Sequence, residues 1–364
     1  PRPTSGTYWP ENLSGKLNAH RVSPPEIGED LLKPFFPENH KINLSCKKHL
    51  QELRKHLAET YSTHSAATHL MESDPDWDFM AVHYRGIEEI SKHFMPFHPP
   101  RMADTSREDF QTFQHVVKAT YHIHDVMLQS LIAQAGPDTT VILVSDHGYH
   151  SDDLRPKFTP RVCGGNTVWH RDQGVFLANG PGIITTPVPV PGAGLLDITP
   201  TILHHFDLPV GNDMEGRVIS EAFQNNTAPQ TIPTWENPDT PSQSRGSRSE
   251  EESQALLQQF VDLGYIDEVS SDPSEAAFET NRENKWNIAR SYLYTGDHAS
   301  ALPLLEDCFN AVPERTDYAQ ALARTQLKLG LADEASETLE VCLESFGNTF
   351  SAHLLKGQIE LEKG

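Results

Sequence analysis

The last part of the chain repeats itself every 34 residues, and this repeat constrains the fold more than any other feature of the sequence. At this spacing Ala289 aligns with Ala323 and Gly357, and Gly296 aligns with Gly330. Further pairs at the same spacing are Ala301 and Ala335, Leu305 and Leu339, and Cys308 and Cys342. Small residues at fixed intervals let two helices approach closely, and a glycine suits the turn between them. We therefore predict stacked helical hairpins, each of which buries its apolar face against the next.

This pattern resembles the tetratricopeptide repeat, with two full copies and the start of a third over residues 282–364. The resemblance implies an all-α array whose concave face binds a protein or peptide partner. Residues 253–280 are expected to form a bridging helical segment. Residues 224–252 are predicted to be a linker, because they are rich in proline, serine and threonine and contain almost no aliphatic residues.

The overall charge argues against a nucleic-acid partner. In 364 residues, 51 acidic side chains outnumber 29 basic ones, so the formal charge is −22. Such a surface repels a phosphate backbone, and no binding of a nucleic-acid polymer is expected. The sequence has no run of 18 apolar residues, so no membrane span is predicted. The 4 cysteines lack CxxC spacing and indicate neither a disulfide framework nor a cysteine-ligated zinc, which is compatible with a cytoplasmic location.

The amino-terminal part of the chain mixes helical and strand patterns. Apolar spacing predicts helices over residues 46–71 and 107–135, and a short buried strand over 76–84. The continuous apolar run Val141–Val144 is typical of a parallel strand that is covered on both faces. Functional groups often collect just beyond the carboxyl end of such a strand, so Ser145–Gly148 is a candidate site.

Asp146 and His147 are the first candidate metal ligands. A carboxylate and a neutral imidazole at consecutive positions of a tight turn can bind one divalent ion. Gly148 would let the backbone turn away without crowding the metal. The residues alone leave a second interpretation open, in which Asp146 caps the next helix and His147 lies at the surface.

Three blocks of sequence resemble the alkaline phosphatase superfamily, in particular its type I phosphodiesterase and nucleotide pyrophosphatase-like branch. Residues 138–148 (DTTVILVSDHG) are similar to its metal-binding strand and turn. Residues 163–183 are similar to the segment that carries a late histidine ligand, here His170. Residues 195–217 are similar to the closing helix and turn that are shared with sulfatases. The resemblance extends from about Gly6 to Pro233 and implies an α/β alkaline phosphatase-like domain, present in part, over residues 1–223.

The resemblance also implies a reaction. In this superfamily two metal ions, usually Zn²⁺, hold a phosphoryl group while a serine or threonine attacks phosphorus and is later released by water. By resemblance, Asp146 and His147 bind the ion beside the nucleophile and His170 binds the other ion. The expected substrate is a phosphoester, more readily a diester or a pyrophosphate than a monoester.

The other ligands of the second ion are expected from an Asp-x-x-x-His block, where this sequence departs from the family. An alignment without gaps places Glu88 at the aspartate position and Lys92 at the histidine position, with His93 one residue further on. A protonated lysine cannot bind a cation as a ligand. Three interpretations stay open: a repositioned site that uses Glu88 and His93, a site in which the Lys92 ammonium replaces the second ion and contacts the phosphoryl oxygens, and a site that has lost its chemistry.

No nucleophile can be assigned in this sequence. The family places it, with the first aspartate ligand, in a βα unit ahead of the segment that Gly6–Pro10 resembles. Thr4 and Ser5 follow no strand and are not candidates. We therefore expect a longer natural chain or an inactive polypeptide, and no phosphoester hydrolysis by this fragment. The predicted function is that of a metal-dependent phosphoester hydrolase, and the alternative is a non-catalytic interaction scaffold that uses the helical repeats.

Overall fold

The computed structural model describes residues 10, 12–37, 47–158, 169–171, 173–185, 190, 192–225, 227–236, 273–346 and 350–363. They belong to two compact units, Pro1–Pro181 and Gly182–Gly364. Several sequence features lie outside the described residues, namely Thr4, Ser5, residues 163–168, the predicted linker beyond Glu236 and the bridging segment before Pro273.

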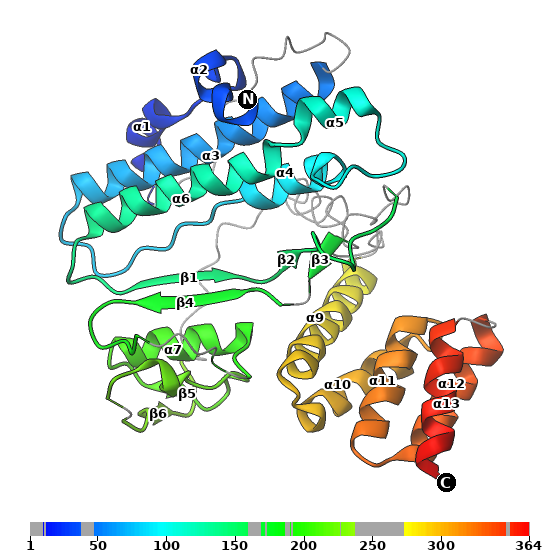
Figure 1. Cartoon of the computed structure of the whole chain (residues 1–364). Helices are drawn as coiled ribbons and strands as arrows, with labels where there is room; N and C mark the ends of the chain where they lie inside the picture. The colour runs from blue at the N-terminus through cyan, green and yellow to red at the C-terminus, as the bar shows by residue number, and fades with distance from the viewer. Residues whose placement is uncertain are drawn as a thin grey trace. The chain divides into compact units, whose positions relative to one another are not determined.

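The first unit consists mainly of helices, with a few short strands among its described residues (Figure 1). Its helices are α1 (Leu13–Leu17), α2 (Glu29–Leu32), α3 (Lys47–Ser73), α4 (Gly86–Phe94), α5 (Arg107–Phe113) and α6 (Val116–Ala135). Its strands are β1 (Val141–Ser145), β2 (Gly148–Tyr149), β3 (His170–Arg171) and β4 (Val175–Asn179).

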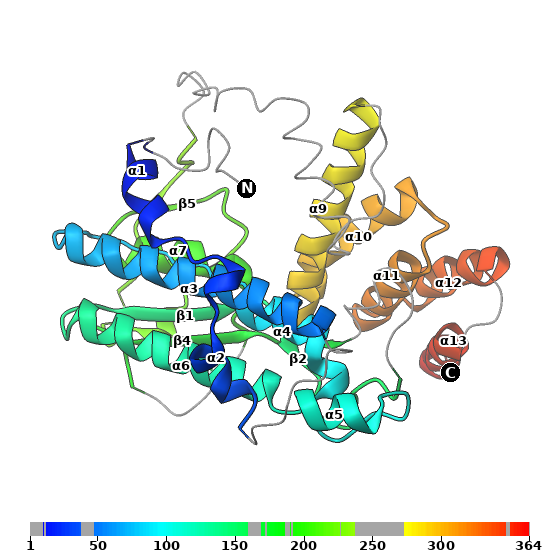
Figure 2. The same cartoon turned by 90° about the horizontal axis from the view of Figure 1, so that it is seen from above.

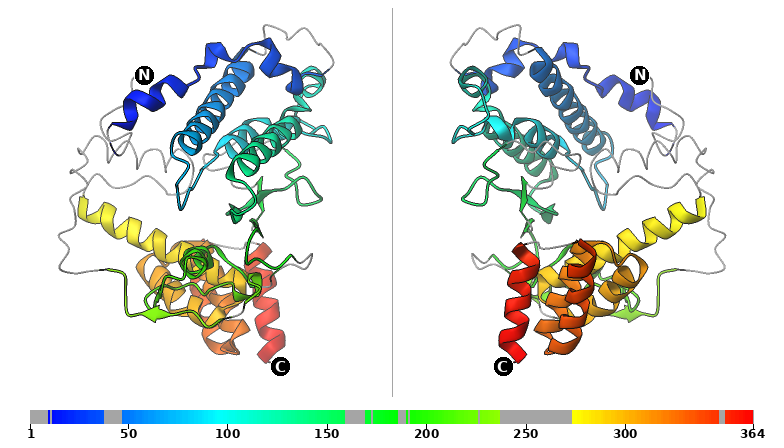
Figure 3. Two further views of the ribbon diagram at one scale, coloured as in Figure 1. Left: turned by 90° about the vertical axis from the view of Figure 1, so that its left-hand side faces the viewer. Right: turned by 90° about the vertical axis from the view of Figure 1, so that its right-hand side faces the viewer.

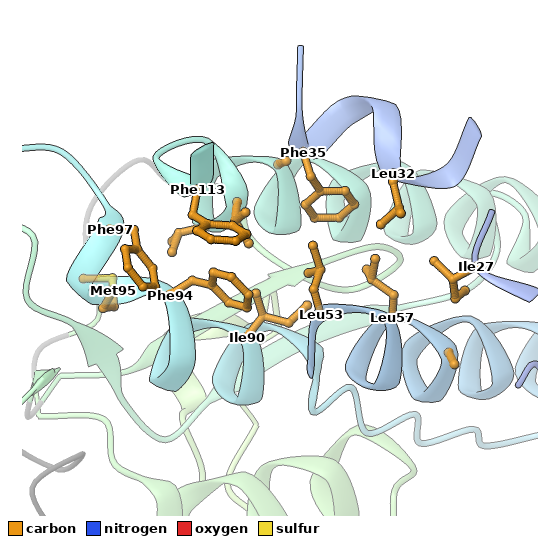
Figure 4. Packing of buried hydrophobic residues seen from close by; sticks show 14 of the residues in the cluster. Ile27, Leu32, Phe35, Leu53, Leu57, Ile90, Phe94, Met95, Phe97 and Phe113 are labelled. Atoms are coloured by element: carbon orange, nitrogen blue, oxygen red, sulfur yellow. The ribbon is translucent and has the colours of Figure 1, made fainter. Parts of the chain in front are cut away.

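Helices α3, α4 and α6 pack on one another around a core of aliphatic and aromatic side chains (Figure 4). Leu53 and Leu57 of α3 meet Ile90 and Phe94 of α4 in this core, and all four side chains are fully buried. Complete burial of such a side chain contributes about 1.5–3 kcal/mol. The helical spacing in residues 46–71 therefore predicted α3 correctly, and its apolar stripe faces the core as expected.

One strand prediction in this unit is wrong, and another is right in its position but wrong in its pairing and burial. Residues 76–84 form no strand, and Phe79 in this stretch is 58% exposed. The run Val141–Val144 does form β1, but β1 pairs antiparallel with β4, and Leu143 and Val144 are 40% and 44% exposed. An apolar run indicates a preference for burial without specifying the partner strand, so it could not distinguish the two pairings.

The predicted helix 107–135 is divided in two. A turn at Gln114 and His115 separates α5 from α6. The flanking Phe113 and Val116 are both fully buried in the core. Neither turn residue breaks a helix by itself, so tertiary packing overrides the local propensity here.

In the second unit, residues 182–236 contain helix α7 (Ile198–His205) and the strands β5 (Val210–Gly211) and β6 (Thr231–Ile232). The Asp197 carboxylate precedes α7 and accepts hydrogen bonds from the backbone N–H groups of Gly194 (2.9 Å) and Arg217 (2.8 Å). Strands β5 and β6 pair in parallel, and the Trp235 indole donates to the Pro209 carbonyl. The first part of the predicted linker is thus paired with residues 209–211.

The remaining helices, α9–α13, form the repeat array (Figures 2 and 3). Each of them contacts the next one along the chain. They are α9 (Pro273–Thr295), α10 (His298–Ala311), α11 (Thr316–Lys328), α12 (Ala332–Phe346) and α13 (Phe350–Lys363). The small and aliphatic residues of the 34-residue pattern are buried at their interfaces: Ala289, Ala301, Leu305, Ala323, Ala335 and Leu339. The prediction of stacked helical hairpins is confirmed. In the described part of the chain, none of the helices has the length and the apolar character that crossing a bilayer requires.

Candidate metal centre

Three side chains from separate parts of the first unit converge on one point. They are Glu88 on α4, His147 between β1 and β2, and His170 on β3, and their ligand atoms all lie within 4.8 Å of one another. The short pairing of β2 with β3 sets Tyr149 opposite His170, which brings together residues that are far apart in sequence. We refer to Glu88, His147 and His170 as the first site.

Aromatic packing fixes the two imidazole rings of the first site. The rings of His147 and His170 are stacked, with centroids 3.7 Å apart and an interplanar angle of 11°. The ring of Tyr149 packs edge-on against both, at 5.6 and 5.2 Å. The Tyr149 hydroxyl donates a hydrogen bond of 3.1 Å to the backbone carbonyl of Glu88, which ties the histidines to α4.

The protonation of both histidines suits a metal ligand. The His147 Nδ1 atom lies 3.2 Å from the Gly148 carbonyl oxygen, which can only accept, so Nδ1 carries the proton and Nε2 presents its lone pair. Burial lowers the pKa of His170 to about 4, and the nearby positive charge of Lys92 and any protonation of His147 lower it further. The His170 Nε2 atom is buried and has no hydrogen-bond partner. A neutral ring with an unsatisfied buried nitrogen is what a cation would require.

Lys92 brings a positive charge into the first site. Its Nζ atom lies 2.5 Å from Glu88 Oε1 and 3.9 Å from Glu89 Oε1, and its side chain is only 5% exposed. Glu89 is in turn paired with Arg85 at 2.7 Å. A helix places residues four apart on one face, which explains why Lys92 meets Glu88. The Glu88 carboxylate therefore already has a cationic partner.

The other two predicted ligands are not members of this group of three, although Asp146 lies beside it. The Asp146 side chain is 58% exposed, and its Oδ1 atom is 3.8 Å from His147 Nε2. His93 lies on another face of α4 than Glu88, and its ligand atom belongs to a different group, with Glu52 and His56. The resemblance assigned His147 and His170 to two different ions. In the structure their ligand atoms lie in the same group of three, with Glu88.

Sequence reasoning did not single out Glu52, His56 or Tyr149. The spacing of Glu52 and His56, four residues apart in a predicted helix, is a signal that could have paired them. Nothing in the sequence indicates that His93 would complete this pair, because the contact depends on how α3 packs on α4.

The chain thus combines two parts. The first unit holds the cluster of one carboxylate and two histidines, and helical repeats follow it in the sequence. Residues 4–157 match the family of type I phosphodiesterases and nucleotide pyrophosphatases, and residues 292–359 match the tetratricopeptide repeat. Residues 4–157 thus belong to the former family, and residues 292–359 are tetratricopeptide repeats. Glu88 and His147 lie inside the first matched region, and His170 lies beyond it. No curated protein and no solved structure matches the chain significantly.

Proposed function

We propose that this chain supplies the metal-binding part of a metal-dependent phosphoester hydrolase, and that Glu88, His147 and His170 bind one divalent cation at the first site. The convergence of these three side chains within 4.8 Å supports the proposal, because two of them lie in the region that matches the phosphodiesterase family. A diester or a pyrophosphate is the proposed substrate class.

The donor set fits Zn²⁺. Two imidazole nitrogens and one carboxylate oxygen are the ligands of many catalytic zinc sites, which keep a fourth position open for substrate. A bound divalent ion would supply Lewis acidity toward a phosphoryl oxygen. Tyr149 holds the two imidazoles in place through its ring and through its hydrogen bond to Glu88.

Lys92 adds a second positive charge beside the same carboxylate. In the proposed reaction its ammonium group would balance the negative charge of a bound phosphoryl group, as the second ion does elsewhere in the superfamily. An ammonium group binds phosphate oxygens by hydrogen bonds and charge, without serving as a metal ligand.

Isothermal titration of the chain with Zn²⁺ and Mn²⁺ tests the first site. We expect His147→Ala and His170→Ala each to weaken binding at this site at least tenfold, since each removes one ligand. His122→Ala is the matched control, because His122 is exposed on α6 and belongs to neither metal-ligand group. Equal binding by the wild type and both site variants would refute the proposed centre. Hydrolysis itself is tested with a nitrophenyl phosphodiester.

A second candidate function is a non-catalytic interaction scaffold. Two observations favour it: the tetratricopeptide repeats at residues 292–359, and the Lys92 ammonium group at the carboxylate of the first site. Absence of any divalent-ion binding at the first site, together with binding of a peptide by residues 273–363, would favour this alternative.

A further inference from the structure

We propose a second divalent-metal site that links helices α3 and α4, formed by Glu52 and His56 of α3 and His93 of α4. The ligand atoms of these three side chains lie within 4.8 Å of one another. We refer to them as the second site. This proposal is independent of phosphoester chemistry, because the second site shares no residue with the first.

Helix geometry sets two of the three ligands side by side. Glu52 and His56 are four residues apart, so they project from the same face of α3. His93 follows Glu88 by five residues, which at 3.6 residues per turn rotates it by about 140° away from the first site. The same helix α4 can therefore present Glu88 to one centre and His93 to the other.

The ring of His56 is buried and held in an orientation that suits a metal ligand. It is only 3% exposed, and its Nδ1 atom lies 3.3 Å from Glu59 Oε2. An ionised carboxylate only accepts hydrogen bonds, so Nδ1 carries a proton, and the neutral form of the ring has its lone pair on Nε2. A histidine that binds a metal commonly donates its other ring N–H to a carboxylate in this way.

The Nε2 atom of His56 has no hydrogen-bond partner although it is buried. The Glu52 Oε2 atom is 3.7 Å from this nitrogen, which exceeds hydrogen-bond distance. Buried polar atoms in native proteins are almost always satisfied. A cation placed among Glu52, His56 and His93 would satisfy this nitrogen.

The helices that carry the second site are held together by the core. The rings of His56 and His93 are 5.4 Å apart at an interplanar angle of 25°. Leu53 and Leu57 pack with Ile90 and Phe94 in the adjoining core (Figure 4), which restricts the movement of α3 against α4. His93 itself is exposed, so a metal ion can reach the second site from solvent.

The ligand types select the metal. Two imidazole nitrogens and one carboxylate suit Zn²⁺ or Co²⁺, whereas Mg²⁺ and Ca²⁺ prefer oxygen ligands throughout. Three protein ligands leave a position for water, which the exposure of His93 permits. Because the ligands come from two helices, bound metal would cross-link α3 to α4 and raise the stability of the first unit.

The test measures Zn²⁺ binding in a background that lacks the first site. We expect His170→Ala to retain one bound Zn²⁺ in equilibrium dialysis, and His170→Ala/His93→Ala to bind it at least tenfold more weakly. His170→Ala/His122→Ala is the matched control and should bind as the single variant does. His93 and His122 are both exposed, so neither substitution is expected to prevent folding. Circular dichroism confirms the fold of each variant.

Thermal unfolding gives an independent readout. Zn²⁺ should raise the unfolding temperature of His170→Ala but not that of His170→Ala/His93→Ala. Adding Glu52→Gln to His170→Ala should reduce the rise in unfolding temperature, because it removes the carboxylate charge. Equal Zn²⁺ affinity of His170→Ala and His170→Ala/His93→Ala would overturn the proposal. That result would favour His56 as a charged partner of Glu52 and Glu59. If the wild type and His170→Ala bind the same single equivalent, the first site fails while the second stands.

Discussion

At the scale of single residues, Lys92 determines how the first site can work. It stands where the family resemblance expects a histidine, and its ammonium group contacts Glu88 at 2.5 Å in a buried position. A divalent ion must share or take over that carboxylate. In the proposed site, Lys92 would therefore compete with the metal for Glu88, although it could assist the binding of an anionic substrate.

Lys92→Met removes this competition while it keeps an unbranched side chain of similar length. We expect Zn²⁺ to bind at the first site at least tenfold more tightly, which corresponds to about 1.4 kcal/mol. Lys92→Arg keeps the charge and is the control that should show no such gain. Titration calorimetry of both variants in the His93→Ala background isolates the first site. Unchanged affinity in Lys92→Met would show that the ammonium group does not compete.

The pKa of His170, about 4 instead of 6.5, gives a second test at this scale. In the metal-free protein, nuclear magnetic resonance should show this ring staying neutral at pH 5.5. Folding favours the neutral ring, so the contribution of His170 to stability is complete above pH 6.5 and is lost as the pH falls toward about 4. In Lys92→Met the pKa should rise, because a neighbouring positive charge is removed. Titration of His170 near pH 6.5 in the wild type would contradict this.

Residue types and local resemblance predicted part of the first site. His147, His170 and Glu88 were all expected as ligands and lie together, whereas Asp146 is exposed and His93 belongs to another group. The alignment placed His93 one residue from a ligand position, but in a helix one residue is a rotation of about 100°. Sequence proximity therefore could not indicate which centre His93 joins.

At the scale of elements, the helical repeat was predictable, whereas only one of the two predicted strands forms and its pairing was not foreseen. Repetition at 34 residues marks the same structural position several times, so each alanine or glycine supports the others. Residues 76–84 and 141–144 each offered a single short apolar run. Such a run does not reveal whether a partner strand exists or in which direction it runs. This is why one predicted strand is absent and the other pairs antiparallel with β4.

The two turn glycines of the repeats give a prediction at this scale. Gly296 and Gly330 have φ angles of +81° and +79°, in the left-handed region that L-residues adopt at a cost. Each glycine-to-alanine substitution should lower the free energy of unfolding by about 1 kcal/mol. A Cβ atom at either position would meet no neighbour within 4 Å, so the loss measures backbone strain alone.

Gly357 is the matched control because it lies within α13 and a Cβ atom there also meets nothing within 4 Å. Gly357→Ala should raise the free energy of unfolding by about 0.5–1 kcal/mol, since glycine is unfavourable inside a helix. Urea denaturation followed by circular dichroism measures all three variants. The same sign of change at positions 330 and 357 would contradict the assignment of Gly330 as a strained turn residue.

At the scale of the whole molecule, all six residues of the two proposed sites lie in one compact unit. The first site and the second site both belong to Pro1–Pro181, and α4 contributes to each. The helical repeats belong to Gly182–Gly364, where the described residues contain no comparable group of metal ligands. The two proposed metal sites and the tetratricopeptide repeats therefore lie in separate units of the chain.

Hydrogen exchange tests whether this separation extends to stability. A ligand at 100 times its Kd stabilises the state that binds it by about 2.7 kcal/mol, which slows exchange through global opening about 100-fold. We expect Zn²⁺ to slow exchange in α3, α4 and β2–β3, and to leave α10–α13 unchanged, because no proposed ligand lies in the repeats. In the variant His170→Ala/His93→Ala, Zn²⁺ should not slow exchange in any of these elements. Equal slowing in α10–α13 would mean that both units unfold together, so that metal bound by the first unit also stabilises the repeats.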